Sequence, residues 1–451
     1  KACRAVGKRV PSQAASNLAS AKALIQQGQT VVIGSRRCNT KEAFSIQNSL
    51  DKKDHLEEIE EMKLLARTIG YNIVDSITQT RKSIDPATYF GKGKINQVIE
   101  NTLMLNVKTI FINDDLKPNH YKNIKKLTKD KIEIIDRTCL ILNIFSQNAK
   151  TNESKSQVRL ATLQYMMPRL TGMWTHLERQ MGGVGTRGGP GEKQIEIDRR
   201  IIRKDITKLK RDLEKVSKQR KNQTKLRRNI FKVSLVGYTN AGKSSLLEKI
   251  SGYKAFIKDQ LFATLETTTK KVKLPSKTEI VLSDTVGFLR KLPHNLVASF
   301  RSTLSDIIDS DLIIKVIDLS SSDIDGHIST INNTLKNLRA DKCNYIYVFN
   351  KIDLVDNQNV FKKINKKYNN PIMVSTLKEL RIDTLINKID EIATNDFKDY
   401  KIEIKYKDLK IIDYIYKNSV VRKRLDKYEN IEFEISCDLK SYNRIIKRIE
   451  A

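Results

Sequence analysis

The 451-residue sequence predicts an α/β fold: a phosphate-loop nucleotide-binding domain whose mostly parallel sheet carries helices on both faces. Two observations lead to this prediction. Residues 237–244 have the pattern Gly, four residues, Gly-Lys-Ser, between a strand-like stretch and a helical one. Strand-like and helical stretches also alternate on both sides of this run, which is typical of parallel strands joined through helices. We expect a small α/β subdomain and a helical hairpin before this domain, and a small α+β domain after it.

The composition points to a polyanionic partner. The net charge is +31 and the isoelectric point is near 9.7, and nucleic acid is the usual partner of so basic a chain. A second interpretation is open, because lysine, asparagine and isoleucine have A- and T-rich codons and genome composition would also raise the lysine count. No apolar run approaches the roughly 18 residues that a membrane-spanning helix needs, so we expect a soluble protein. The five cysteines are scattered, which suits reduced thiols in a cytosol-like compartment.

Residues 1–41 are set apart from the fold. They contain no Asp or Glu and carry Arg, Lys, Ser, Ala and Gln, a composition similar to that of an organelle transit segment. The absence of a methionine at Lys1 suits equally well an upstream or expression-derived remnant. We therefore exclude this extension from the fold prediction. The expected location is the cytoplasm, or an organelle matrix if residues 1–41 are a transit segment.

Residues 42–150 alternate between helical and strand-like patterns, which predicts a small parallel α/β subdomain. Residues 55–70 have the pattern of a helix. Three stretches have the pattern of strands: residues 71–77, 107–112 and 131–136. A further helix opens after Gly91, where Lys92 and Lys94 are candidates for contact with an RNA backbone. A tight turn into a helix, without a binding role, is the simpler explanation of this run.

Residues 151–228 predict a helical hairpin. Residues 154–180 are helical with an interruption near Pro168, and residues 192–228 form a second helix. The glycine-rich residues 182–191 between them cannot pack a core, so they are expected to form an exposed tip. The second helix has apolar residues at the 4-3-4-3 spacing of a heptad seam: Ile202, Ile206, Leu209, Leu213 and Val216.

The second helix of this hairpin is strongly basic. Residues 192–228 hold 15 Lys or Arg against 6 Asp or Glu. An excess of one charge sign favours RNA binding, whereas balanced charges are expected of a merely solvated helix, which is the alternative. The candidate RNA-contacting residues of the hairpin are Gly183, Gly185, Arg187, Gly188, Arg199 and Arg200.

The phosphate loop lies in the domain expected over residues 229–397. Its glycines let backbone N–H groups turn inward around a polyphosphate, and the following helix N-terminus adds partial positive charge. Lys243 is expected to reach the β- and γ-phosphates, and Ser244 is expected to bind Mg²⁺. The predicted binding residues of this loop are Gly237, Tyr238, Thr239, Asn240, Ala241, Gly242, Lys243 and Ser244.

The run Asn350-Lys351-Ile352-Asp353 favours guanine over adenine, and it follows a strand-like stretch. The Asp353 carboxylate can accept hydrogen bonds from the ring N–H and the exocyclic amine of guanine, a donor pair that adenine lacks. Asn350 is expected to hold the neighbouring loops and the base edge, and the Lys351 stem is expected to cover the ring. GTP and GDP are therefore the expected ligands.

Two segments are expected to respond to the γ-phosphate. Asp284 would contact Mg²⁺ through water, and the Gly287 N–H would bind the γ-phosphate, so this segment distinguishes GTP from GDP. In the other segment, Thr264 is the expected second Mg²⁺ ligand. Its rivals are Thr267, Thr268 and Thr269. The predicted residues of the two segments are Phe262, Ala263, Thr264, Leu265, Glu266, Asp284, Thr285, Val286 and Gly287.

Phe288 follows Gly287, at the position where many GTPases have a glutamine that orients the attacking water. Phenylalanine cannot do this, so we expect slow intrinsic hydrolysis and stimulation by a partner. Asn240 could help to bind a monovalent cation beside the phosphates in place of an arginine finger, which leads to the hypothesis of K⁺-stimulated hydrolysis. The predicted catalytic residues are Asn240, Lys243, Thr264 and Gly287.

Residues 398–451 predict a small α+β domain. Residues 401–406 have the pattern of a strand, residues 411–421 that of a helix, and residues 431–436 that of a second strand. No catalytic arrangement is recognisable in this part of the sequence.

Taken together, these motifs resemble those of the HflX GTPases. The likeness covers about residues 45–451. Besides the nucleotide motifs, it rests on residues 86–94, 136–138, 168–172 and 182–192. The resemblance implies an α/β N-terminal subdomain, a helical hairpin, a G domain and a small C-terminal domain. It also implies a last guanine-binding loop at Ser375, Thr376 and Leu377.

Three positions depart from the family pattern. Glu266-Thr267 stands where the family usually has Asp-Pro, and the last guanine loop has Thr376-Leu377 in place of Ala-Lys or Ala-Arg. The backbone N–H of Thr376 could still reach the guanine carbonyl. The glycine-rich tip has a doubled glycine, Gly188-Gly189, that not every member has.

The resemblance implies a Mg²⁺-dependent GTPase that binds the large ribosomal subunit and its rRNA, with the glycine-rich tip near the peptidyl-transferase region. Such proteins dissociate stalled or idle ribosomes, notably under stress, and the ribosome stimulates their GTPase activity. Family members have also been linked to ATP binding through the N-terminal part. Two alternatives stand beside this expectation: an ATP-driven RNA helicase or remodeller, and a GTP-regulated rRNA-binding scaffold without splitting activity. Nothing in the sequence indicates an obligate dimer, so a monomer is expected.

Overall fold

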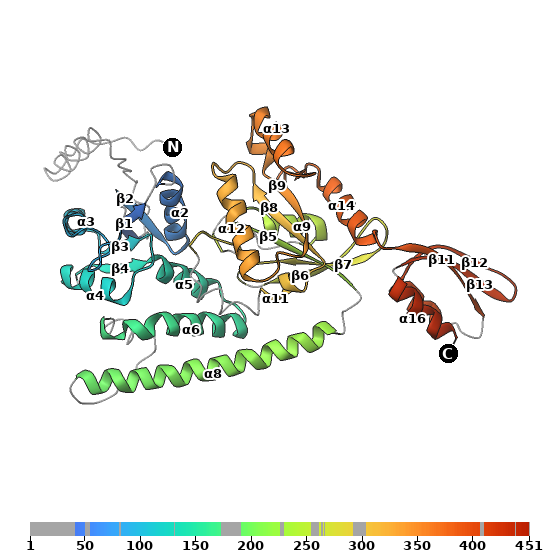
Figure 1. The fold of residues 1–451 in the computed structure, drawn as a ribbon, viewed down its shortest axis with the longest axis horizontal. Coiled ribbons are helices and arrows are strands. Elements are labelled where there is room, and N and C mark those ends of the chain that lie inside the picture. The colour runs from blue at the N-terminus through green and yellow to red at the C-terminus, as the bar shows by residue number, and fades with distance from the viewer. Residues whose placement is uncertain are drawn as a thin grey trace, which may run out of the picture. The chain divides into compact units, whose positions relative to one another are not determined.

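The computed structural model describes residues 41–49, 55–80, 83–129, 131–172, 191–225, 230–253, 261–262, 265, 267–291, 304–405, 410–437 and 439–450. Outside this part lie residues 1–40, the expected glycine-rich tip as far as residue 190, and seven predicted site residues: Gly183, Gly185, Arg187, Gly188, Ala263, Thr264 and Glu266. The chain divides into two compact units (Figure 1). Residues 148–160 and those from 207 onward form one unit, and the remainder forms the other.

The first unit is built on a four-stranded parallel sheet with the strand order β2-β1-β3-β4. Its strands are β1 (Lys41–Ser49), β2 (Tyr71–Thr80), β3 (Thr109–Ile112) and β4 (Glu133–Asp136). Its helices are α2 (His55–Thr68), α3 (Lys92–Met104), α4 (Pro118–Leu127) and α5 (Arg137–Asn148). Phe44, Ile46 and Phe111 are fully buried, as expected of parallel strands covered on both faces. The predicted α/β subdomain is therefore present, and its first strand begins at Lys41, the last residue of the extension that was excluded.

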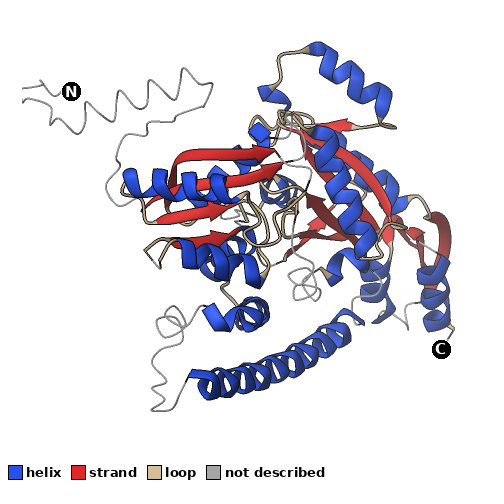
Figure 2. Cartoon of the chain, turned by 60° about the vertical axis from the view of Figure 1, so that its left-hand side comes forward, coloured by secondary structure: helices blue, strands red, loops and turns tan. Residues whose placement is uncertain are grey.

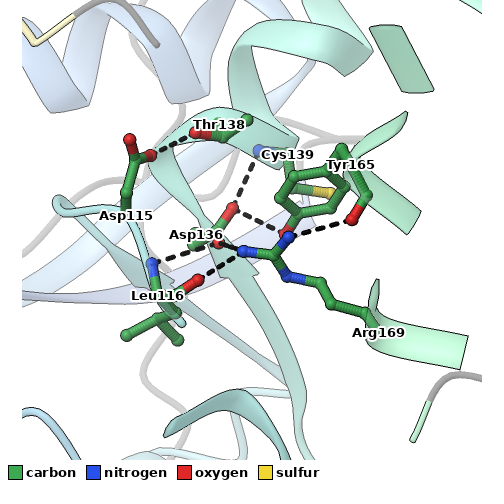
Figure 3. A network of polar contacts seen from close by, with 7 residues as sticks. All are labelled: Asp115, Leu116, Asp136, Thr138, Cys139, Tyr165 and Arg169. Carbon is green, nitrogen blue, oxygen red and sulfur yellow. Dashed lines mark hydrogen bonds and ion pairs between the residues drawn. The ribbon is translucent and has the colours of Figure 1, made fainter. Parts of the chain in front are cut away.

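A buried polar network joins two motifs of the first unit that lie far apart in the sequence (Figure 3). Asp136, at the end of β4, accepts hydrogen bonds from the Cys139 N–H and the Tyr165 hydroxyl, both at 2.8 Å. Arg169 lies 3.4 Å from the Asp136 carboxylate and donates to the carbonyl oxygens of Leu116 and Tyr165. The motifs at residues 136–138 and 168–172 thus meet in one ion pair that ties the sheet to the following helices.

The connecting region is helical, as predicted. It contains α6 (Asn152–Met166), the short 3-10 helix η1 (Met167–Gly172) and the long helix α8 (Gly191–Lys225), which is continuous over its whole length (Figure 2). Along the predicted heptad seam Ile202 is buried, and the other four apolar residues are half-buried. Within the described part of the chain, no helix is long and apolar enough to cross a membrane.

The second unit contains a six-stranded sheet with the order β10-β9-β8-β5-β7-β6. β6 is antiparallel to β7, and the other neighbouring strands are parallel. The strands are β5 (Phe231–Gly237), β6 (Thr268–Lys273), β7 (Glu279–Asp284), β8 (Leu312–Asp318), β9 (Asn344–Asn350) and β10 (Ile372–Met373). This sheet is the mostly parallel one that the sequence predicts.

Helices cover both faces of this sheet, as Figure 2 illustrates. Apolar side chains of α9 (Lys243–Ser251) and α14 (Ile382–Thr394) pack on one face. Those of α11 (Ser305–Ile308), α12 (Ile324–Asn337) and α13 (Gln358–Lys367) pack on the other. The two hydrophobic cores hold the strands, and the loops at the strand ends are left to form a binding site.

The C-terminal part forms an antiparallel sheet with the order β11-β13-β12. Its elements are β11 (Lys398–Lys405), α15 (Lys410–Asn418), β12 (Val420–Asp426), β13 (Asn430–Cys437) and α16 (Leu439–Ile449). The helix predicted over residues 411–421 is wrong at its end. It stops at Asn418, and Val420 and Val421 belong to β12, where they pair with Ser436 and Ile435. These β-branched side chains continue an apolar helical pattern but gain more from sheet pairing.

We predict that Asp136→Asn destabilises the first unit at pH 7.5 by about 2–4 kcal/mol, because the new amide group turns an N–H towards Arg169 and the Leu116 N–H. Burial raises the pKa of Asp136 to about 6, against the opposing effect of Arg169. The folded state therefore binds more protons than the unfolded state between about pH 4 and 6, and stability falls as pH rises through this window. Pulse proteolysis of the full chain in urea measures both effects.

Asp115→Asn is the matched control. Asp115 is exposed and accepts a hydrogen bond from the Thr138 hydroxyl, so this substitution is expected to cost less than about 1 kcal/mol and to leave the pH dependence in place. Equal losses of stability in the two variants would show that the burial of Asp136 does not add to its contribution to stability.

Candidate nucleotide-binding site

Three of the predicted motifs lie at the carboxyl ends of strands in the second unit. Gly237 ends β5, Asp284 ends β7 and Asn350 ends β9. These strands belong to the run β9-β8-β5-β7, and the carboxyl ends of parallel strands meet at one edge of a sheet. The motifs are therefore brought together by the topology, and the contacts below show how.

Glycine is required at positions 237 and 242 of the phosphate loop for different structural reasons. A Cβ on Gly237 would lie 2.3 Å from the Val316 carbonyl oxygen of the adjacent strand β8, so only glycine allows this close packing. Gly242 has a φ of 89°, and a Cβ there would lie 2.1 Å from Nδ2 of Asn350. Gly242 also precedes α9 without a side-chain cap, so the helix N-terminus is open to an anion.

Lys243 is buried in this loop. Its ammonium group donates to the carbonyl oxygens of Gly237 at 3.2 Å and Tyr238 at 2.8 Å. Burial lowers its pKa to about 8, while Asp284 acts in the opposite direction. The Thr239 hydroxyl is also buried and has no hydrogen-bond partner within the described part of the chain. An anionic ligand such as a polyphosphate would give the Lys243 ammonium group a negative partner and the Thr239 hydroxyl a hydrogen-bond acceptor. These residues therefore fit the predicted nucleotide.

Ser244 and Asp284 provide oxygen ligands that suit Mg²⁺. The Ser244 hydroxyl donates to Asp284 Oδ2 at 2.6 Å. Hydroxyl and carboxylate oxygens are the donors that Mg²⁺ prefers, and this ion needs few protein ligands beside phosphate oxygens. Ser244 would therefore bind it directly, and Asp284 would contact it through water. Thr264, the other predicted ligand, lies outside the described residues, and its rivals Thr268 and Thr269 belong to strand β6.

Asn350 connects the phosphate loop to the last predicted guanine loop. Its fully buried amide donates to the Ala241 carbonyl at 3.0 Å and to the Thr376 hydroxyl at 3.2 Å. Its Oδ1 accepts from the Thr376 N–H at 3.1 Å, so a guanine carbonyl would have to share or replace this bond. Asp353 accepts from the Ser375 hydroxyl at 2.5 Å, which fixes the carboxylate expected to recognise guanine.

Lys351 and Leu377 complete the guanine loops. Lys351 has a φ of 65°, and its ammonium group pairs with Asp318 at 2.7 Å. Sequence reasoning missed Asp318, although an acidic residue that ends an apolar strand could have drawn attention to it. The Leu377 side chain is exposed, and Ile352 packs partly against the core beside α12 and α13.

Phe288 is a core residue. It is almost completely buried among apolar side chains that include Val236 and Ile317. Its backbone is hydrogen-bonded to the phosphate loop on both sides: its N–H donates to the Gly237 carbonyl, and its carbonyl accepts from the Thr239 N–H, each at 2.9 Å. The side chain therefore cannot orient a water molecule, in agreement with the sequence argument.

The remaining predicted residues of the G domain have mainly structural contacts. Thr285 is fully buried and donates through its hydroxyl to the Leu235 carbonyl at 2.7 Å. Phe262 is buried and accepts from the Asn148 side chain at 2.9 Å. Leu265 and Val286 are also buried. Asn240, in contrast, is exposed, with a φ of 61°.

The predicted RNA-contacting residues that the structure describes belong to the first unit. Lys92 and Lys94 are in the first turn of α3, and Lys94 donates to the Gln97 side chain at 3.2 Å. Arg199 and Arg200 are on α8, where Arg200 is exposed and Arg199 is half-buried. The exposed side chains among them are accessible to a partner.

Three family models match consecutive parts of the chain. A GTP-binding GTPase N-terminal model matches residues 56–146, a GTP-binding GTPase middle-region model matches residues 148–227, and a model described as 50S ribosome-binding GTPase matches residues 232–351. The N-terminal model ends and the middle-region model begins on either side of residue 147, where the first stretch of the first unit ends. The third model contains the phosphate loop and Asn350.

Curated relatives are similar over most of the chain. GTPase HflX of Caldanaerobacter subterraneus is 37% identical over 391 residues, which are 85% of this chain and 89% of the relative. GTPase HflX of Escherichia coli is 39% identical over 303 residues, which are 67% of this chain and 70% of the relative. Among solved structures, a GTP-binding protein from Sulfolobus solfataricus in complex with GDP is 27% identical, with a TM-score of 0.41 and coverage of 79% of this chain and 99% of that one.

The lowered pKa of Lys243 predicts that nucleotide binding takes up a proton. Bound phosphates would raise this pKa again, so between about pH 8 and the higher pKa of the complex the affinity for GDP should fall by up to about tenfold per pH unit as pH rises. Calorimetry at pH 9 in buffers of different ionisation enthalpy measures the proton uptake directly.

Lys315 offers a matched control, because burial lowers its pKa to about 8 as well. It lies on β8, where its ammonium group donates a hydrogen bond to the Asn332 side chain. Lys315→Met should retain the proton uptake and Lys243→Met should abolish it. Uptake that survives in Lys243→Met would assign the proton to another group.

Proposed function

This chain belongs to the HflX family of GTPases and hydrolyses GTP, and we propose that its GTP-bound form binds the large ribosomal subunit and dissociates stalled or idle ribosomes. Hydrolysis would then release the protein. The description of the matching G-domain family as ribosome-binding supports a ribosomal partner, and the family membership of the whole chain supports GTP and GDP as its nucleotides.

The observation that carries the ribosomal proposal is the charge of α8. This helix contains 13 lysines and arginines against six acidic residues. Its apolar seam is wholly or partly buried, and its basic side chains Lys204, Lys208 and Arg211 are exposed. A row of exposed cations on one rigid helix is suited to a phosphate backbone, because each phosphate contact releases condensed counterions. We propose that the glycine-rich residues before α8, which lie outside the described part of the chain, also contact rRNA.

The nucleotide would control this binding through the phosphate loop. Ser244 and Asp284 would hold Mg²⁺, which neutralises charge on the β- and γ-phosphates when it is bound. Gly287 lies directly against Thr239 and Lys243, so its N–H is suited to detect the γ-phosphate. GTP would therefore engage the Gly287 N–H and the segment at Thr264, and GDP, which has no γ-phosphate, would not.

Ribosome dissociation is tested on a sucrose gradient. We predict that assembled ribosomes incubated with this protein and a non-hydrolysable GTP analogue yield more free subunits than ribosomes incubated with the protein and GDP. Binding to large subunits without a gain in free subunits would favour the scaffold alternative, and an equal effect of ATP analogues would favour the helicase alternative.

Charge-reversed variants locate the binding surface. Lys204→Glu, Lys208→Glu and Arg211→Glu together should weaken binding to large subunits and reduce the slope of log affinity against log salt concentration by about 3. The control reverses three exposed lysines of α13, Lys362, Lys363 and Lys366, and so makes the same change in net charge. Equal losses of affinity in both variants would show that the net charge of the chain, and not the position of these residues on α8, determines binding.

We also propose that K⁺ stimulates hydrolysis, with Asn240 as a ligand. Phe288 has no polar group that could orient water, and the exposed Asn240 is in the phosphate loop, where a bound cation would assist hydrolysis. Turnover in K⁺ buffer is expected to exceed turnover in Na⁺ buffer by about 10²-fold in wild type and to differ little in Asn240→Ala. Equal wild-type rates in the two buffers would exclude this role.

A further inference from the structure

Tyr238 reaches from the phosphate loop to two other segments. Its ring is stacked on that of His327 in α12, with the ring centroids 3.9 Å apart and the planes inclined by 13°. Its hydroxyl accepts a hydrogen bond from the Arg290 N–H at 3.1 Å. Tyr238 is itself almost completely buried. The first variable residue of the phosphate loop thus connects the segment after Gly287 to a helix on one face of the sheet.

The Arg290 side chain makes a second connection to the same helix. Its guanidinium group pairs with Asp323, which caps α12 by accepting from the Gly326 N–H at 3.0 Å. A Cβ on Gly326 would lie 2.2 Å from Arg290 Nη2 and 1.9 Å from Asp323 Oδ2, so the ends of both side chains would have to shift to admit alanine.

Between these anchors lies the segment that is expected to detect the γ-phosphate. The backbone of Phe288 is held to Gly237 and Thr239 by the two hydrogen bonds described above. A Cβ on Gly287 would lie 2.9 Å from Thr239 Cα and 3.1 Å from Lys243 Nζ, so this residue stands against the phosphate-binding ammonium group. The position of Gly287 is therefore fixed by the phosphate loop and, through Arg290 three residues later, by α12.

We propose that Tyr238, Arg290, Asp323 and Gly326 form a clamp that positions Gly287 for GTP hydrolysis. The four residues touch no reacting atom; they act through the backbone of residues 287–290. Because the Phe288 side chain is buried in the core, the rate of GTP hydrolysis depends on where the backbone of residues 287–290 lies relative to the phosphates. GDP has no γ-phosphate for Gly287 to contact, so loosening the clamp acts on GTP binding and turnover and leaves GDP binding unchanged.

Gly326→Ala tests the clamp without weakening the helix, because alanine is a better helix former than glycine. In the full chain, single-turnover hydrolysis of GTP should slow by about 10–100-fold. The affinity for a non-hydrolysable GTP analogue should fall by about tenfold relative to that for GDP, and GDP affinity should stay within about twofold of wild type. Ser329→Ala, at an exposed position of the same helix, is the control and should match wild type.

Tyr238→Phe removes the hydroxyl that accepts from Arg290 and keeps the stacked ring. It should slow hydrolysis in the same way, whereas Tyr368→Phe, which removes a hydroxyl bonded at 3.2 Å to Asp325, the residue before Gly326 in α12, should not. Arg290→Lys should retain more activity than Arg290→Met. Wild-type turnover in both Gly326→Ala and Tyr238→Phe would overturn the proposal, and so would equal losses of affinity for GDP and the GTP analogue, which indicate general damage to the site.

Discussion

The G domain depends on the pair of hydrogen bonds that joins Phe288 to Gly237 and Thr239. β5 and β7 are adjacent parallel strands, and these bonds continue their pairing beyond the sheet into the loops that carry the chemistry. The phosphate loop and the segment after Asp284 therefore behave as one piece of backbone. On the proposed mechanism, a change at the γ-phosphate is transmitted because Gly287 begins in a defined position against Lys243.

Asn350 and the clamp extend this arrangement to the rest of the domain. Asn350 fastens the phosphate loop to the guanine loops through a fully buried amide. Tyr238 and Arg290 fasten it to α12 on one face of the sheet. Buried polar groups of this kind fix geometry because leaving any of them unpaired costs free energy. The phosphate loop is therefore held at its base by buried contacts on both sides.

Much of the site could be predicted from the sequence, because its motifs are short and their chemistry is local. The phosphate loop, Asp284, Asn350 and Asp353 were recognisable from residue type, spacing and the strands that precede them. The clamp was not, because Tyr238, Arg290 and Gly326 meet only through the fold and share no local pattern. The partner of Asp136 was hidden for the same reason, since Arg169 lies on a different element.

Secondary structure was predictable where periodicity was strong, as in α8, and failed where two structures share one pattern. Val420 and Val421 extend an apolar helical stretch, yet they pair with β13 because long-range sheet contacts override local preference. Strand β1 was missed because its partners, β2 and β3, lie up to about 70 residues away along the chain. The structural contacts of Thr285 and Phe262 could not be predicted either, because their partners, Leu235 and Asn148, lie far away in the sequence.

Amide hydrogen exchange in this chain, freed of nucleotide, tests most directly whether Gly287 is positioned before GTP arrives. The amides of Thr239 and Phe288 are predicted to exchange as slowly as those in the centre of β5, and addition of GTP should change them little. Fast exchange of both amides without nucleotide, slowed only when GTP is added, would contradict the account, because the loop would then be ordered by its ligand.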